Sequence, residues 1–345
     1  MPDQSRLLHH PADRVARQIL SRELAQWVRS RRRLGRRRTS RALHDFRVAL
    51  RRLRSTLRAF RAYLQPAKGL RSRLRSLAGD TNESRNLEIW QGWVSEQAKF
   101  LTARQAIGVR WLQGRLRTRK RRAELRMRGK ISGSFAGLQR ELEAMVHAHP
   151  RGGRRAASDA ALAAAVRDGR ADLRQQLTRV HSLRDREAAH EARIAAKRLR
   201  YLLEPFAPEL AGGGKLVDRL ELLQDVLGEI HDAHVFADEL RDALTEASEG
   251  RSRVVGRRLL PWPAAEPAPG KRPPPGARVG LLALARRLRA DGEQRFERLR
   301  AERRKGTVAD LLRGLTRMGR GLREGSGRPD LNRRLPAPKA GALPD

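Results

Sequence analysis

Apolar residues along the chain recur every three or four positions, and runs that alternate strictly between apolar and polar residues are missing. This spacing places the apolar side chains on one face of an α-helix, so it predicts an all-α protein. The helical pattern covers residues 13–33, 41–64, 70–77, 87–128, 134–147, 159–180, 187–203, 216–244 and 281–304, with approximate ends.

Glycine and proline interrupt this pattern and divide the chain. A Gly- and Arg-rich break at 150–155 separates two blocks of helices. Proline and glycine are dense at about 250–280 and again at 324–345, which predicts a loop inside the second block and a disordered tail. The expected domain covers residues 5–320, with repeat one at about 5–149 and repeat two at about 156–320.

The two blocks contain an internal repeat. The segment from His44 to Phe60 (HDFRVALRRLRSTLRAF) aligns without a gap with the segment from His190 to Phe206 (HEARIAAKRLRYLLEPF). The same register carries RLRSLAGDTNESRNLEIW, which ends at Trp90, onto RLELLQDVLGEIHDAHVF, which ends at Phe236. Two separate segments in one register indicate a duplicated helical unit. We therefore expect two bundle-like halves related by an internal pseudo-two-fold.

The chain is also strongly basic, with 76 Lys and Arg against 38 Asp and Glu and a formal net charge of +38. So much like charge destabilises a compact state unless an anionic partner neutralises it. Arg predominates, and its planar fork of donors matches phosphate oxygens. There is no Cys, which excludes disulfides, thiolate metal sites and Cys nucleophiles.

Many of these charges form one stripe in each copy. On a helix the basic residues of the first copy fall within roughly 80° of one another, opposite the apolar face. They are His44, Arg47, Arg51, Arg54 and Arg58, and their counterparts are His190, Arg193, Lys197 and Arg200, with Glu204 in place of Arg58. Like charges at this spacing repel. A solvated surface would explain a single stripe, whereas the duplicated one favours a polyanion lying along it.

Other matching positions are weaker candidates. Arg85 and His231, near the starts of predicted helical segments, either add donors for an anion or are ordinary surface residues. Arg73 and Arg219 either extend the groove or pair with carboxylates.

Arg52 and Arg198 lie roughly 120° off the stripe. Ion pairs with residues such as Asp80 or Asp232 are as plausible for them as ligand contact.

The histidines need separate treatment. His44 and His190 each head a row of cations, which suits donation to phosphate better than metal binding. His231 and His234, with Asp232 between them, have a spacing that divalent ions use, but without a second cluster the pattern is weak.

The pattern H-x-x-R-[VI]-x-x-[RK]-R-L-R occurs twice, and R-N-x-E or H-D-x-H follows each copy. This doubled pattern closely resembles the CHAD family, the conserved histidine α-helical domain, over about residues 5–320. The resemblance implies two helical halves whose basic stripes line a central channel that binds inorganic polyphosphate and that can direct the protein to polyphosphate granules. It assigns to that surface His44, Arg47, Arg51, Arg52, Arg54, His190, Arg193, Lys197, Arg198 and Arg200. Where the family has R-D-x-D-V, this chain has RNLEI at 85–89 and HDAHV at 231–235.

We expect a non-catalytic binding protein with no cofactor and no metal. The E-x-E-x-K strand of the hydrolase module found in some relatives is absent, as are the nucleotide-binding, serine-hydrolase and zinc-protease motifs. Sequence-independent nucleic-acid binding is the main alternative, although few aromatics accompany the basic residues. A polyphosphate-acting enzyme is the third. Without a signal peptide or an apolar span, we expect a cytoplasmic protein with no membrane partner; the oligomeric state stays open.

Overall fold

The computed structural model describes residues 7–36, 40–148, 158–259 and 273–326. Every regular element in these residues is a helix, which confirms the all-α prediction. The first half contains η1 (Leu7–His9), α1 (Ala12–Arg36), α2 (Ser40–Ala59), α3 (Arg61–Leu64), α4 (Leu70–Asp80), α5 (Asn82–Ala98) and α6 (Ala103–His147). The second half contains α7 (Ser158–Thr178), α8 (Arg186–Leu203), η2 (Glu204–Phe206), α9 (Gly213–Leu259), α10 (Ala277–Arg304) and α11 (Thr307–Ser326).

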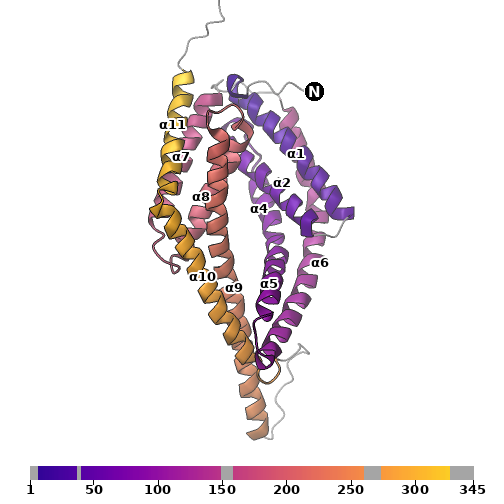
Figure 1. Cartoon of the computed structure of the whole chain (residues 1–345). Helices are drawn as coiled ribbons and strands as arrows, with labels where there is room; N and C mark the ends of the chain where they lie inside the picture. Colours follow the sequence, from indigo (N-terminus) through magenta and orange to yellow (C-terminus); the bar gives the residue numbers. More distant parts are fainter. Residues whose placement is uncertain (1–6, 37–39, 149–157, 260–272, 327–345) are drawn as a thin grey trace, which may run out of the picture.

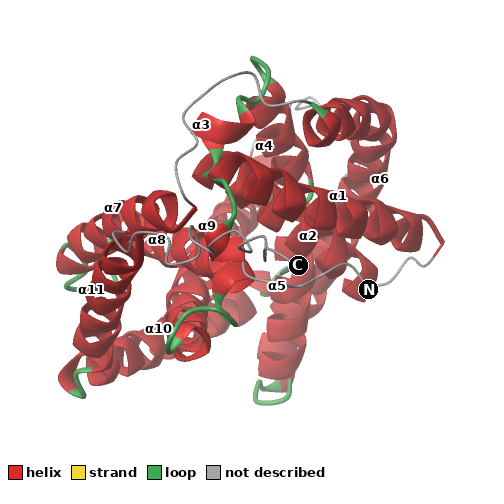
Figure 2. Ribbon diagram, turned by 90° about the horizontal axis from the view of Figure 1, so that it is seen from above, coloured by secondary structure: helices red, strands yellow, loops and turns green. Residues whose placement is uncertain are grey.

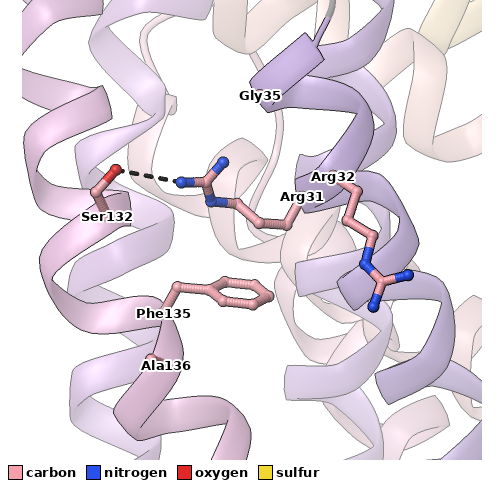
Figure 3. A pocket seen from close by; sticks show the side chains of 6 residues that line it. All are labelled: Arg31, Arg32, Gly35, Ser132, Phe135 and Ala136. Atoms are coloured by element: carbon pink, nitrogen blue, oxygen red, sulfur yellow. Dashed lines mark hydrogen bonds between the residues drawn. The ribbon is translucent and has the colours of Figure 1, made fainter.

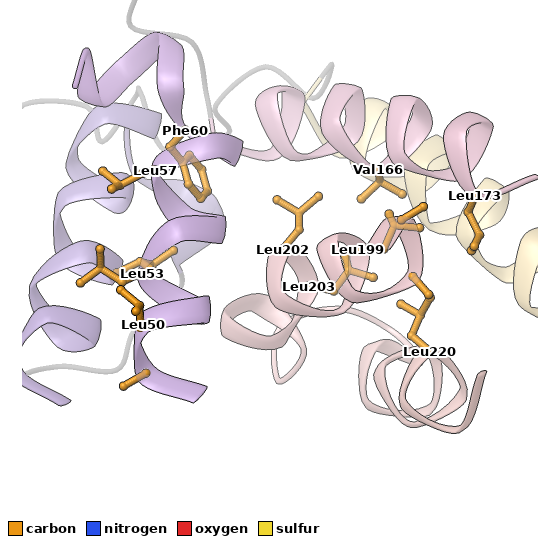
Figure 4. Packing of buried hydrophobic residues seen from close by; sticks show 14 of the residues in the cluster. Leu50, Leu53, Leu57, Phe60, Val166, Leu173, Leu199, Leu202, Leu203 and Leu220 are labelled. Carbon is orange, nitrogen blue, oxygen red and sulfur yellow. The ribbon is translucent and has the colours of Figure 1, made fainter. Parts of the chain in front are cut away.

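The two halves lie beside each other along their lengths, with α1 to α6 on one side and α7 to α11 on the other (Figures 1 and 2). Within each half, the helix that carries the basic stripe packs its apolar face against its own neighbours. Leu50, Leu53 and Leu57 of α2 are buried, as are Leu199 and Leu203 of α8 (Figure 4). The buried residues of α2 and α8 belong to one continuous apolar core, and this burial fixes the rotation of both helices, so their basic edges are turned away from that core.

The halves touch each other through residues that match in the repeat. The rings of Phe60 and Phe206 lie 6.2 Å apart between centroids, and those of Trp90 and Phe236 lie 5.5 Å apart. Contact between equivalent residues is what a local two-fold axis produces. The pseudo-two-fold relation of the complete halves stays a prediction.

Several boundaries differ from the sequence prediction. The single helix expected at 87–128 is wrong, because the chain turns between α5 and α6. Thr102 caps α6: its hydroxyl accepts from the backbone N–H of Gln105, and the Gln105 amide accepts from the Thr102 N–H. The break expected near 128–134 is also absent, and α6 runs continuously to His147.

The second half is more helical than expected. The predicted loop at 250–280 begins too early, since α9 continues to Leu259 and the prolines start only at Pro261. We also missed α11, which follows Gly306, a residue with the positive φ of 78° that glycine readily adopts. The rest of the predicted loop, at 260–272, and of the predicted tail, at 327–345, lies outside the described residues. No helix of the described residues is long and apolar enough to span a bilayer.

Candidate functional site

Cations from the two stripes converge between the halves. Arg47, Arg51 and Arg54 of α2 lie close to Arg193 and Lys197 of α8, and we call these five residues the central cation group. Burial, followed by the charges of Arg51 and Arg85, lowers the pKa of Arg47 to about 10. Arg193, from the other half, contributes in the same direction. The fold thus brings together cations that are far apart in sequence.

Lys197 shows most clearly how crowded this region is. Burial, then the charges of Arg193 and Arg51, lower the pKa of its amine to about 7. No described carboxylate lies within 4.0 Å of any member of the central cation group. Arg51 also has a buried Nε with no hydrogen-bond partner. Holding partly buried cations without paired counter-ions is unfavourable, and an anion in this space would reduce that cost.

The junction between two helices of the first half positions the guanidinium of Arg47. Arg47 donates from Nη1 to the carbonyl oxygen of Thr81 at 2.5 Å and to its hydroxyl at 2.9 Å. Thr81 is buried at the junction of α4 and α5, where the helical hydrogen bonding is interrupted and a carbonyl becomes available. At the matching place in the second half α9 runs on without interruption.

Asp232 of α9 is a carboxylate beside these cations. Burial raises its pKa despite the attraction of Arg193, Arg85 and, less strongly, Arg295 and Arg47. No described basic side chain comes within 4.0 Å of it, so it does not neutralise any single guanidinium by a direct ion pair.

The histidines of the second half contact each other. The Nδ1 atoms of His190 and His231 are 3.1 Å apart, so one ring donates and the other accepts. Burial and the charge of Arg193 lower the pKa of His231 to about 3, which keeps its ring neutral at neutral pH. His44 is exposed, and Arg85 is near it in the place that matches His231. Partial loss of hydration, followed by the charges of neighbouring arginines, lowers the pKa of both His44 and His190.

The H-D-x-H segment does not gather its side chains into one site. His231 faces His190, whereas Nε2 of His234 lies 2.7 Å from the carbonyl oxygen of Leu183. In the described part of the chain, no group of three or more His, Asp or Glu side chains is arranged to hold a metal ion. His231 also lies in the middle of α9, so its placement near a helix start was wrong; Arg85 is indeed in the first turns of α5.

Several of the predicted basic residues are held in ion pairs, among them Arg85, which pairs with Glu88 one turn along α5 at 3.0 Å. Arg73 forms a bidentate ion pair with Glu141 of α6, with N···O distances of 2.5 and 2.6 Å. Arg52 pairs with Glu204 at 3.1 Å and Arg198 with Asp172 at 3.4 Å. The sequence left open whether the last three of these arginines form ion pairs or contact a ligand, and in the structure they form ion pairs. The partners are not Asp80 or Asp232, which were the candidates for Arg52 and Arg198.

The last residue of the second stripe is not on the open basic edge. Arg200 is buried and pairs with Glu221 at 2.6 Å and with Glu204 at 3.2 Å. It also donates to the Tyr201 hydroxyl at 3.1 Å. Arg219 is partly exposed and forms no ion pair with a described carboxylate within 4.0 Å.

The sequence analysis missed basic residues outside the stripes. Arg75 and Arg71 of α4 and Arg61 of α3 lie near the stripe of α2, while Arg295 lies near Asp232. Arg75 could have been noticed, because its match in the second copy is Glu221, a reversal of charge within the repeat.

A depression elsewhere also contains arginine. It lies between α1 and α6 and is lined by Arg31, Arg32, Gly35, Ser132, Phe135 and Ala136 (Figure 3). Arg31 donates to the Ser132 hydroxyl at 3.2 Å, and its guanidinium carbon lies 5.8 Å from the Phe135 ring centre. This depression contains none of the repeated basic residues, so it is a weaker candidate than the central cation group.

Comparison with known proteins agrees with the all-helical fold. The fold is similar to the crystal structure of the CHAD domain from the plant Ricinus communis, with a TM-score of 0.59 and 18% identity over 83% of this chain and 93% of that one. It is also similar to PptA from Streptomyces chartreusis, with a TM-score of 0.63 and 16% identity over 88% of this chain and 99% of that one. No curated protein matches the sequence. The CHAD domain family model matches residues 18–241, so this chain belongs to the CHAD domain family.

Proposed function

We propose that the protein binds inorganic polyphosphate, without catalysis, through the central cation group. The observation that carries the proposal is a set of partly buried cations from both halves that lacks ion-paired carboxylates. Polyphosphate carries one negative charge on each inner phosphate at neutral pH, and a linear chain can lie along both stripes at once. Contact with one stripe then raises the effective concentration of the ligand at the other.

The aromatic residues of the site argue against nucleic acid, the second candidate. Phe46 and Phe60 of the first copy, and Tyr201 and Phe206 of the second, are all buried in the core. Binding of single strands usually relies on exposed rings that stack on the bases. The central cation group instead offers guanidinium forks, which suit phosphate oxygens.

The proposed role is binding alone. Asp232 is surrounded by guanidiniums, and the described residues of the site supply neither a carboxylate cluster for Mg²⁺ nor a nucleophile held by a base. We propose that the protein acts in the cytoplasm, where such binding would direct it to polyphosphate granules.

A titration tests the proposal. Long-chain polyphosphate, single-stranded RNA and duplex DNA are added to the protein at the same physiological salt concentration, and release of orthophosphate is followed with Mg²⁺ or Mn²⁺. We expect polyphosphate to bind most tightly and no orthophosphate to appear. Equal or tighter binding of RNA would favour the second candidate. Orthophosphate release that a substitution at Asp232 abolishes would show an enzyme.

A further inference from the structure

Among three matching positions near the ends of the stripes, two reverse their charge between the halves. In the first half the three residues are Arg54, Arg58 and Arg75, and in the second half they are Arg200, Glu204 and Glu221. The charge of Arg75 helps to lower the pKa of Arg54 after burial, and at the matching place Arg200 pairs with Glu221 at 2.6 Å. The first trio carries three positive charges, whereas the second, with one arginine and two glutamates, carries one net negative charge.

The second trio is closed to an anion. Arg200 is buried, and Glu204 and Glu221 both lie within 3.2 Å of its guanidinium. Glu204 also pairs with Arg52 from the first half. A phosphate arriving here would meet two carboxylates and would have to displace existing ion pairs.

Two further arginines, Arg61 and Arg71, lie close to the first trio. Burial, followed by the charges of Arg61 and Arg58, lowers the pKa of Arg71, and Arg75 lowers it further. Arg58, Arg61 and Arg75 are exposed, and none of the four residues pairs with a described carboxylate within 4.0 Å. The carboxylates that act on Arg58 are Asp172, which is already paired with Arg198, and Glu191.

The backbone adds to this positive region. Arg71 and Arg75 are one helical turn apart on the first two turns of α4, so they share a face. Helix α4 begins after Gly69 with no side-chain cap and no acidic residue in its first turn. Its free N–H groups and the positive end of its dipole therefore favour an anion beside the same two arginines.

We propose that a bound polyphosphate chain leaves the central cation group on the side of the first half only, and that Arg58, Arg61, Arg71 and Arg75 bind this continuation. We call these four residues the α4 extension. The inference rests on the proposed function. It adds the direction in which the bound chain continues and a dependence of affinity on chain length. Chains that are long enough to reach the α4 extension bind more tightly than chains that fill only the central cation group.

The test compares two double variants over a series of chain lengths. Arg71→Gln with Arg75→Gln removes two charges from the α4 extension. Arg117→Gln with Arg121→Gln is the matched control, because these exposed residues of α6 have the same spacing and no described carboxylate within 4.0 Å. Affinity for tripolyphosphate and for long-chain polyphosphate is measured at several salt concentrations, together with the thermal unfolding midpoint.

We expect the α4 variant to bind long chains about tenfold more weakly, with a salt slope smaller by about one unit for each lost contact. Its affinity for tripolyphosphate should change less than twofold. The control should behave as the original protein does. The unfolding midpoint should not fall, because the substitutions relieve repulsion.

Three results would overturn the inference. Unchanged binding of long chains by the α4 variant would show that the continuation is not used. An equal loss of affinity in the control variant would mean that net charge alone determines binding. An equal loss of affinity for tripolyphosphate would mean that the α4 arginines belong to a site for short chains. Failure of the proposed function is visible separately, because then the original protein itself would not bind long chains.

Discussion

The C-terminal parts of α2 and α8 occupy matching places in the two halves, but their charges serve different ends. On α2, Arg54 and Arg58 face further arginines of α3 and α4. On α8, the matching Arg200 is buried between Glu204 and Glu221. The comparison teaches that matching basic residues can differ in their state because their acidic partners differ. In the first copy Arg54 and Arg58 have no ion-paired carboxylate among the described residues, which suits the proposed ligand, and in the second Arg200 is held in ion pairs within the fold.

The largest expected effect comes from removing the charges that both copies share. Arg51→Gln combined with Arg193→Gln takes one cation from each half of the central cation group. Because the two halves bind one chain together, we expect the affinity for long-chain polyphosphate to fall by more than about a hundredfold. Fluorescence titration at fixed salt measures it. Two single variants whose losses sum to that of the pair in free energy would show that the halves bind independently.

The next largest effect should come from substituting Arg54, which we compare with the same substitution at the matching Arg200. Arg54→Gln should weaken polyphosphate binding about thirtyfold, since a charge-assisted contact is lost, and should leave stability unchanged. Arg200→Gln should leave binding nearly unchanged but lower the free energy of unfolding by about 2 kcal/mol, because its buried ion pairs are lost. Urea unfolding and the same titration separate the two. Loss of affinity in Arg200→Gln with full stability would contradict this difference between the copies.

The low pKa of Lys197 predicts a dependence on pH. In the free protein its amine loses its proton as the pH rises through about 7. A bound polyanion favours the charged form, so binding takes up a proton, and affinity should be about tenfold weaker at pH 8 than at pH 6. Lys197→Arg should remove most of this dependence, leaving the smaller contributions of His44 and His190. A profile that is the same in the variant would rule out Lys197 as its source.

The smallest expected effect concerns the closed end of the second copy. Glu221 is half exposed and pairs with Arg200. Glu221→Gln removes a repelling charge, so we expect polyphosphate affinity to rise by about twofold at most, measured at low salt. A gain as large as the loss in Arg54→Gln would mean that the second copy also guides the ligand.

The helical class and the two stripes could be predicted from the sequence, because the apolar spacing determines which edge of α2 and α8 is left outside the core. Ends of helices were harder to predict. The turn before α6 depends on one capping pair, Thr102 with Gln105, inside an otherwise continuous pattern. The run 251–259 contains no proline, and its helix was missed because the prolines just after it dominated the composition of the window.

Only those features of the site that depend on residue spacing along a single helix could be predicted from the sequence. The stripe predicted that Arg47, Arg51, Arg193 and Lys197 lie on basic edges, but their convergence requires the packing of one half on the other. Arg200 has the same helical position as Arg54, and only its contact with α9 shows that it is buried in ion pairs. Spacing along a chain places a side chain on a face, whereas its partners come from other helices.

The central claim is that one polyphosphate chain lies between α2 and α8 on the cations of both copies. A crystal structure of the protein with long-chain polyphosphate bound tests this most directly. The account predicts continuous phosphate density within hydrogen-bond distance of Arg51, Arg193 and Lys197, which continues toward Arg71 and Arg75. Density confined to another surface, such as the exposed arginines of α6, with the central cation group unoccupied, would contradict it.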